Sequence, residues 1–411
     1  GPIRKNLLAL ERKLQEETDA DDDLQKLLHH AAQTTEFYRP YKGCASLSDF
    51  PVIKKSLVRQ QYDQFISSGY RNQPLHKVST SGSTGERFVL LQDKRKRRKV
   101  LSELIYFHAQ CGFNLGDRYV YMIVWHEENK KSKLVQMAEN FIMFDCSYLS
   151  GTSLDELGRL LKTDRSIKCL RGFAMSLAAL AFHLDNKGCT PDMFHLRAVV
   201  SGAERLEPND KALLKKVFGC PVVSRYSNVE NGVLAQQPVD GDYFILNTAH
   251  YFFETLRLDS DRPAPEGEPA RLVVTDLFNY AMPLIRYDTE DIVIMETLEE
   301  KGVKKRILKE VSGRKTDIIY DTRGNWISPH YVTLKFRRYD RLPQFQFVQE
   351  GRKAYTIRLE KALGVYEDKE ILKTMYELIG DDAEIRIEHM DKIPHLSSGK
   401  SRRVVSHYVP G

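Results

Sequence analysis

The spacing of hydrophobic and polar positions changes along the chain, and each change predicts a different kind of structure. Over residues 3–37, apolar and charged residues recur at helical spacing, which predicts a mainly helical N-terminal segment. From about residue 75 to residue 250, strand-like apolar runs alternate with helical patterns. Strands that alternate with helices indicate an α/β architecture with much parallel pairing.

Two of the expected helices carry signals at their ends. The helix expected over residues 152–164 has Ser153 and Glu156 at the spacing of a capping box. The helix expected over residues 209–218 is followed by Gly219, and glycine is typical of a helix C-terminus.

The pattern changes again after residue 250 and predicts two further regions. Residues 251–311 contain strand-like runs separated by turns, which indicates a smaller β-rich subdomain. Short strand-like and helical patterns follow Gly313 and are typical of a small α+β domain. We therefore predict an N-terminal domain of residues 1–315, with α/β subdomains and the β-rich subdomain, and a C-terminal domain of residues 316–411.

Composition limits the classes of protein that fit this pattern. The 411 residues are 42% hydrophobic and 29% charged, as in soluble globular proteins, and no apolar run approaches the ~18 residues of a membrane span. The first 17 residues resemble a charged amphipathic helix and not a signal peptide, so we expect a cytoplasmic protein. The six cysteines form no CxxC pair, so neither a disulfide framework nor a zinc site is expected.

The charge is mildly basic, with a formal net charge of +6, which is compatible with anionic ligands such as ATP or coenzyme A. Residues 94–99 form an unbroken run of lysine and arginine. We interpret the run as the solvated first half of a helix, with a patch that steers anionic ligands as the alternative. Nucleic-acid binding is not expected, because no aromatic-studded sheet or groove-binding helix accompanies the run.

A small-residue loop between two strand-like segments is the first candidate for chemistry. Small residues let a backbone approach a phosphate closely, and their N–H groups and hydroxyls donate to its oxygens. The segment is not a Walker A motif, because Glu86 and Arg87 follow it. A Ser/Gly-rich hairpin turn is the structural alternative. The loop consists of Thr80, Ser81, Gly82, Ser83, Thr84 and Gly85.

Further candidate residues follow predicted strands. The segments Gly202–Glu204 and Tyr226–Glu230 each come directly after an apolar strand, and ligands of open α/β sheets bind outside the carboxyl ends of the strands. An aromatic ring there can stack on a base, and a carboxylate can hold Mg²⁺. Asp291 can accept the two hydroxyls of a ribose, and Lys400, in a Ser/Gly loop, suits a contact to a reacting phosphate. Each motif alone is also compatible with an ordinary turn.

In this order and spacing the motifs resemble the adenylate-forming superfamily of acyl-CoA synthetases, luciferases and nonribosomal adenylation domains. The resemblance is greatest to phenylacetate–CoA ligase and its relatives, some of which occur in polysaccharide biosynthesis. Residues 271–292 are similar to that family's strand–loop–strand with the ribose aspartate, 201–206 resemble its GAEP segment, and 36–62 resemble its N-terminal stretch. The likeness runs from about residue 27 to residue 403 and implies a large N-terminal domain followed by a small mobile C-terminal domain.

The resemblance implies that the protein uses ATP and Mg²⁺, with coenzyme A or an amine as acceptor for a small-molecule or glycan carboxylate. The resemblance also implies roles for individual residues. Thr80–Gly85 would cradle the phosphates of ATP, with Thr84 among the catalytic residues, Gly202, Ala203 and Glu204 would line the adenine, and Tyr226 would stack on the base beside Ser227 and Asn228. Glu230 would bind Mg²⁺, Asp291 would hold the ribose with Arg314 beside it, and Lys400 would bridge the carboxylate and the α-phosphate.

The acyl group is expected to lie against two further segments. Trp125 and His126 end an apolar strand and are candidate walls of the acyl pocket. Gly172, Phe173 and Ser176 fall where relatives contact the acyl group. In the family, the C-terminal domain rotates after adenylation about a hinge, here Thr316 or Asp317, which would withdraw the catalytic lysine.

The chain departs from the family pattern at three places. Glu86 and Arg87 replace the usual continuation of the phosphate loop, and Ser227 replaces a usual glycine. Residues 119–150 do not resemble phenylacetate–CoA ligases, which argues against phenylacetate as the substrate. The readings left open are thioester formation, amide formation, a non-catalytic nucleotide-binding protein and a nucleic-acid-binding module. The oligomeric state is not determined by the sequence.

Overall fold

The computed structural model describes residues 1–16, 21–80, 88–125, 129–146, 149–300, 302–314, 319–327, 332, 335–336, 339, 342, 344–360, 367–393 and 403–408. The chain divides into two compact units, Gly1–Val311 and Ser312–Gly411. Residues 315 and 316, where the sequence predicts a domain boundary, lie outside the described residues, so that boundary stays a prediction.

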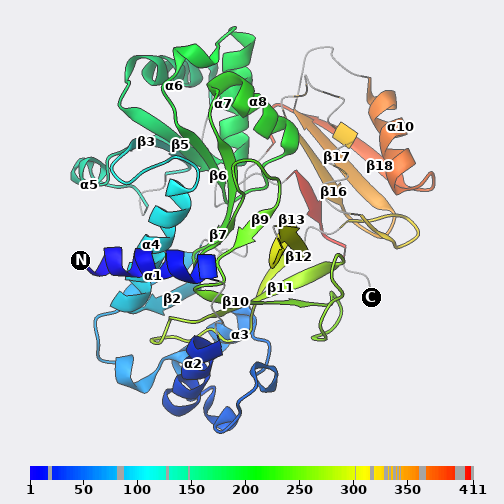
Figure 1. Cartoon of the computed structure of the whole chain (residues 1–411). Helices are drawn as coiled ribbons and strands as arrows, with labels where there is room; N and C mark the ends of the chain where they lie inside the picture. Colours follow the sequence, from blue (N-terminus) through cyan, green and yellow to red (C-terminus); the bar gives the residue numbers. More distant parts are fainter. Residues whose placement is uncertain are drawn as a thin grey trace. The chain divides into compact units, whose positions relative to one another are not determined.

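A large mixed sheet forms the centre of the first unit (Figure 1). Among the described residues it has eleven strands in the order β10-β11-β12-β13-β9-β8-β7-β6-β5-β3-β4. Strands β4, β3, β5, β6 and β7 are parallel neighbours, as the alternating pattern predicts. Their bounds are β3 (Arg118–Ile123), β4 (Phe141–Asp145), β5 (Ile167–Phe173), β6 (Ala198–Gly202) and β7 (Val222–Asn228).

Both faces of these parallel strands are buried, which explains their continuous apolar runs. In β5, Leu170 packs into a core with helices α6, α7 and α8, whereas Cys169 packs on the opposite face with Val200 and Val223. This alternation follows from the two-residue period of a strand. The helices are α6 (Gly151–Thr163), α7 (Ala174–Asn186) and α8 (Pro208–Phe218).

The ends of these helices test two sequence signals. Helix α8 ends as predicted, with Gly219 in the left-handed conformation at φ +63°. The capping box predicted at Ser153 and Glu156 is wrong. Helix α6 begins one residue earlier, Ser150 is its N-cap, and Ser150 Oγ accepts from the Ser153 N–H at 3.1 Å. Ser150 and Ser153 are both residue types that cap helices, and Ser150 is the N-cap in the structure.

The remaining strands continue the same large sheet, and β10 to β13 among them correspond to the β-rich region predicted for residues 251–311. Strand β8 pairs antiparallel with β7 and β9, β9 pairs antiparallel with β13, and β11 pairs antiparallel with β10 and β12. Their bounds are β8 (Gly232–Gln236), β9 (Phe244–Leu246), β10 (Tyr251–Leu256), β11 (Pro269–Asp276), β12 (Tyr287–Glu300) and β13 (Val303–Arg314).

Helices and a hairpin from the N-terminal part of the chain complete the first unit. The helical pattern of residues 3–37 corresponds to two helices, and the hairpin flanks the predicted phosphate loop, with Thr80 paired to Phe88. These elements are α1 (Pro2–Glu16), α2 (Asp21–Thr34), α3 (Lys55–Gln60), β1 (His76–Thr80), β2 (Phe88–Gln92), α4 (Lys94–Ala109) and α5 (Lys133–Ala138).

Helix α4 begins with the basic run, and the interpretation of that run as solvated holds only in part. Lys94, Arg95 and Arg98 are exposed. Lys96 is 1% exposed, and its Nζ lies 2.7 Å from Asp276 Oδ2. Lys96 therefore forms a buried ion pair, although the basic run in which it stands is typical of an exposed helix.

The second unit, described by itself, has its own sheet and core. Strands β18, β17, β16 and β19 form a mixed sheet in that order, and α10 packs into the same core through Ile371, Met375 and Ile379. This is the small α+β architecture that the sequence predicts. The elements are β14 (Ile319–Tyr320), β15 (Trp326–Ile327), β16 (Phe345–Gln349), β17 (Ala354–Glu360), α10 (Asp368–Ile379), β18 (Glu384–Met390) and β19 (Val404–Ser406).

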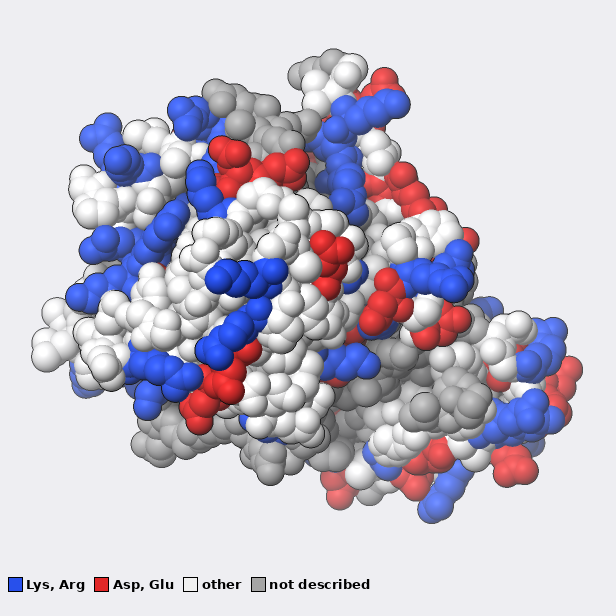
Figure 2. All heavy atoms as spheres, turned by 90° about the horizontal axis from the view of Figure 1, so that it is seen from below, with Lys and Arg blue, Asp and Glu red and all other residues white. Residues whose placement is uncertain are grey.

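Three further observations concern membrane spans, the cysteines and the surface charge. In the described residues, no helix combines the length and the apolar character needed to cross a bilayer. All six cysteines are free, and Cys44 is exposed whereas the other five are buried. On the face shown in Figure 2, side chains of both charges occur, and basic side chains predominate on the left of the view.

Candidate active site at the carboxyl edge of the sheet

The parallel strands bring several predicted residues to one edge of the sheet. Strand β5 ends at Phe173, which is the register partner of Gly202 at the end of β6. Gly202 in turn pairs with Arg225 of β7, directly before Tyr226. The carboxyl ends of neighbouring parallel strands meet at one edge, where α/β proteins bind ligands. The predicted acyl and nucleotide segments are therefore neighbours.

The segment after β6 turns sharply and is fixed to the start of a helix. Ala203 is exposed and has φ +65°, a conformation that is uncommon for residues other than glycine. The carboxylate of Glu204 accepts a hydrogen bond from the Met175 N–H in the first turn of α7, at 3.1 Å. A carboxylate is favourable at a helix N-terminus, so Glu204 holds this turn against α7.

Two residues that the sequence singles out separately lie in contact. Tyr226 Oη donates a hydrogen bond to Asp291 Oδ2 at 2.5 Å, although 65 positions separate them. Burial raises the pKa of Tyr226 well above its ordinary value, and the charge of Asp291 raises it further. A carboxylate has about four acceptor sites, so Asp291 has capacity for further donors such as ribose hydroxyls.

Glu230 has two neighbours that the sequence does not indicate. Its carboxylate is largely buried, accepts a hydrogen bond from Tyr287 Oη at 3.3 Å, and lies 3.9 Å from Lys55 Nζ. Lys55 also lies over the ring of Phe88, the first residue described after the phosphate loop, at 5.1 Å from the ring centroid. Lys55 is therefore placed between the predicted metal ligand and Phe88 at the start of β2.

The donor set around Glu230 fits Mg²⁺ only together with a polyanion. In the described part of the chain, no group of three or more His, Cys, Asp and Glu could hold a metal ion. Mg²⁺ is usually bound by one or two carboxylates and substrate phosphates. A single buried carboxylate beside a lysine matches that arrangement, with Glu230 for the cation and Lys55 for phosphate oxygens.

The structure describes only some of the remaining residues that the sequence assigns to nucleotide binding. Ser227 and Asn228 end β7, and Asn228 Oδ1 accepts a hydrogen bond from the Asn231 N–H at 2.8 Å, which shapes the turn after Glu230. Arg314 ends β13, and its side chain lies outside the described atoms. Ser81–Arg87, Thr316, Asp317 and Lys400 lie outside the described residues, so their roles stay predictions.

The predicted acyl-pocket residues have structural reasons of their own. A Cβ on Gly172 would lie 2.6 Å from the Met122 carbonyl, so only glycine fits between β5 and β3 here. Trp125 is buried and packs edge-on against Tyr121. Ser176 is buried in α7, whereas Phe173 is half-buried at its N-terminus, and His126 lies outside the described residues. Their contact with an acyl group stays a prediction.

Comparisons with known proteins identify similar sequences and similar folds. Residues 319–407 match the family described as CapK C-terminal domain. Protein CapK of Staphylococcus aureus is 24% identical over 377 residues, which cover 88% of this chain and 80% of that protein. Phenylacetate-coenzyme A ligase of Aromatoleum evansii is 22% identical over 398 residues, which cover 89% of this chain and 86% of the ligase.

Solved structures share the fold. 2-Hydroxyisobutyryl-CoA ligase, in the postadenylation state with R3-HIB-AMP, matches with a TM-score of 0.74 at 16% identity, covering 94% of this chain and 88% of that chain. ATP-bound MatB from Rhodopseudomonas palustris matches with a TM-score of 0.55 at 15% identity, covering 79% and 65%. The chain therefore resembles the adenylate-forming superfamily in sequence and in fold. Within that superfamily it is similar to phenylacetate–CoA ligases and to Protein CapK, as its motifs indicate.

Proposed function

We propose that the protein is an ATP-dependent ligase that activates a carboxylate as its AMP ester, releases pyrophosphate and then passes the acyl group to an acceptor. The observation that carries the proposal is the pairing of Tyr226 with Asp291 and of Glu230 with Lys55 in the first unit. The first pair suits a nucleoside, and the second suits a metal-bound polyphosphate. ATP is the common ligand that has both.

The proposed chemistry is positioning and electrostatic stabilisation. A carboxylate oxygen of the substrate attacks the α-phosphorus, the bond to the β-phosphate oxygen breaks, and pyrophosphate leaves with the electron pair. Asp291 orients the ribose, and Lys55 donates to the departing phosphates. Mg²⁺, held through Glu230, would supply positive charge to the phosphate oxygens. Lys400 would bridge the attacking carboxylate and the α-phosphate.

Coenzyme A is the first acceptor to test. Two relatives are phenylacetate-coenzyme A ligases, and two solved structures of 2-hydroxyisobutyryl-CoA ligase contain 2-HIB-AMP and CoA. An amine acceptor, giving an amide, is the second candidate. The match of residues 319–407 to the CapK C-terminal domain does not distinguish between the two acceptors, so both are tested.

The decisive experiment measures pyrophosphate release from ATP and Mg²⁺ with aryl, fatty, amino and uronic acids, each with and without coenzyme A. Hydroxylamine traps any acyl-adenylate. Carboxylate-dependent release is expected, and stimulation by coenzyme A would select the thioester. ATP binding without release for any carboxylate would favour a non-catalytic nucleotide-binding protein. Salt-dependent binding of a random oligonucleotide would instead support the nucleic-acid alternative.

Replacing Lys55 with alanine is expected to lower kcat/KM for ATP by ~10–100-fold, the range for a hydrogen bond to a charged group. The reason is that the variant loses a cation 3.9 Å from Glu230, where the phosphates would lie. ATP–pyrophosphate exchange measures the effect. Lys54→Ala is the matched control, because Lys54 is exposed and its side chain caps no helix. Equal kinetics in the two variants would remove Lys55 from the site.

A further inference from the structure

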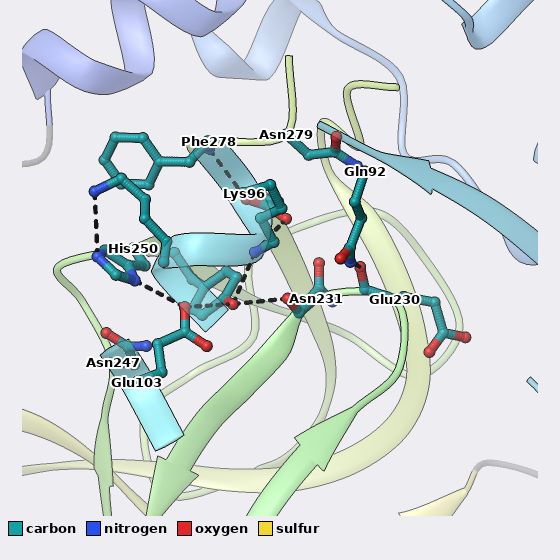
Figure 3. A network of polar contacts seen from close by, with 12 residues as sticks. Gln92, Lys96, Glu103, Glu230, Asn231, Asn247, His250, Phe278 and Asn279 are labelled. Atoms are coloured by element: carbon teal, nitrogen blue, oxygen red, sulfur yellow. Dashed lines mark hydrogen bonds and ion pairs between the residues drawn. The ribbon is translucent and has the colours of Figure 1, made fainter. Parts of the chain in front are cut away.

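A buried cluster of ionisable side chains lies in the first unit, next to the residues assigned to ATP (Figure 3). Its members share near-complete burial and come from α4, β10, β11 and the residue before β10. We call them the Glu103 cluster: Lys96, Glu103, His250, Tyr251 and Asp276, each at most 1% exposed. The proposed chemistry gives these side chains no task.

The cluster contacts the backbone directly after Glu230, where the turn of residues 229–231 leads into β8 at Gly232. Glu103 Oε2 accepts a hydrogen bond from the Val233 N–H at 3.0 Å. Tyr251 Oη lies 2.9 Å from the Asn231 carbonyl oxygen. Side chains from α4 and β10 therefore hold this segment. Glu103 is 130 positions from Val233 in the sequence, and Tyr251 is 20 positions from Asn231.

The fit between the turn and the cluster is tight. A Cβ on Gly232 would lie 2.5 Å from Glu103 Oε2 and 2.7 Å from Tyr251 Oη, and Gly232 has φ +139°. Only glycine combines that backbone conformation with so close an approach. The turn therefore has one position against the two side chains and little room to shift.

The charges of the cluster keep Glu103 an acceptor. Burial raises the pKa of Glu103, but the hydrogen bond from His250 and the charge of Lys96 outweigh it and hold the pKa below its ordinary value. Burial lowers the pKa of His250 to about 4, so the ring is neutral near pH 7. Its Nδ1 lies 2.7 Å from Glu103 Oε1, and its Nε2 lies 3.4 Å from Lys99 Nζ. The proton therefore sits on Nδ1 and is donated to Glu103.

We propose that Glu103 and Tyr251 are positioning residues for Glu230: they hold residues 230–233 so that the Glu230 carboxylate meets the magnesium ion of Mg·ATP. The inference rests on the proposed function for the role of Glu230. Groups that orient a metal ligand control metal affinity, because a ligand displaced by a fraction of an ångström coordinates poorly. A change that loosens the turn should therefore lower the affinity for Mg²⁺ while the protein still folds.

Tyr251→Phe tests the proposal by removing the hydroxyl that contacts Asn231, Glu103 and Lys96 while keeping the ring. Calorimetric titration with ATP at stepped Mg²⁺ concentrations needs no knowledge of the carboxylate. We expect the Mg²⁺ concentration that gives half-maximal tightening of ATP binding to rise ~10-fold, the lower end for groups that orient a metal ligand. ATP binding without Mg²⁺ should be unchanged.

Tyr355→Phe is the matched control, because Tyr355 is a buried tyrosine whose hydroxyl donates to the Tyr320 carbonyl in the second unit. It should leave the Mg²⁺ dependence unchanged at a comparable loss of thermal stability. If Tyr251→Phe does not fold, Glu103→Gln replaces it, since it keeps an oxygen for the Val233 N–H and removes the charge. An unshifted Mg²⁺ dependence in a folded variant overturns the positioning role alone. Wild-type ATP binding that is independent of Mg²⁺ overturns the assignment of Glu230 as well.

Discussion

Replacing Lys96 with alanine is expected to lower the free energy of unfolding by ~3–5 kcal/mol, the cost of removing one partner from a buried ion pair. Asp276 is fully buried, and its burial already raises its pKa despite the nearby Lys96 charge. Without the ammonium 2.7 Å away, the carboxylate would be left in the core beside Glu103, which also carries negative charge. Urea denaturation of the wild type and the variant measures the difference.

The control for this prediction lies two residues away on the same helix. Lys94 is exposed, so Lys94→Ala should change the free energy of unfolding by no more than about 0.5 kcal/mol. A loss below about 1 kcal/mol for Lys96→Ala would show that the buried pair contributes no more than an exposed one. The pair of variants separates the buried cation from the rest of the basic run.

Replacing Lys400 with alanine is expected to slow adenylation by ~10²–10³-fold, the typical loss when one preorganised contact to a developing charge is removed. The lysine in the Ser/Gly loop is proposed to bridge the attacking carboxylate and the α-phosphate, where negative charge accumulates. ATP binding and the fold should be intact, because the contact forms only as the reaction proceeds. ATP–pyrophosphate exchange with the carboxylate found in the substrate panel measures the effect.

Lys353→Ala is the matched control in the same unit, since Lys353 is exposed and pairs with Asp382 at the surface. It should exchange pyrophosphate at the wild-type rate. Full activity in Lys400→Ala would contradict the proposed mechanism, because it would show that Lys400 is not the cation required at the α-phosphate.

The local elements of the fold could be predicted because their signals are local. Apolar runs such as residues 198–200 predict buried strands, and Gly219 marks the end of α8 through its own backbone conformation. The start of α6 was misplaced, because Ser150 and Ser153 offer the same cap and only the geometry of the turn selects between them. The order of the strands in the sheet is set by contacts between distant segments, and hydrophobic spacing alone does not contain it.

The buried charge of Lys96 is a case where distant contacts decide. Lys96 recurs with Glu103 and Phe107 at helical spacing on one face of α4, and all three are buried. In the sequence a charged helical face resembles a solvated one. The partners of Lys96, the hydroxyl of Tyr251 and the carboxylate of Asp276, lie at least 155 positions later, so no pattern within the helix reveals them.

The candidate site divides in the same way. Motifs indicated Tyr226 and Asp291 one at a time, and the sheet explains why their side chains meet. Lys55 was missed because it stands beside Lys54 in a segment with no motif of its own, and only the approach of α3 to Glu230 distinguishes the two lysines. A residue whose role depends on a neighbour from another element has no local signal.

The distribution of the cysteines makes the predicted domain rotation accessible to spectroscopy. Cys44 is exposed, whereas the other five thiols are buried, so a maleimide dye should attach to the folded protein at this position without removal of any other cysteine. Glu384, exposed on β18 of the second unit, can be replaced by cysteine to carry the partner dye. Energy transfer between the two dyes would then follow the distance between the units as ATP, a carboxylate and coenzyme A are added in turn.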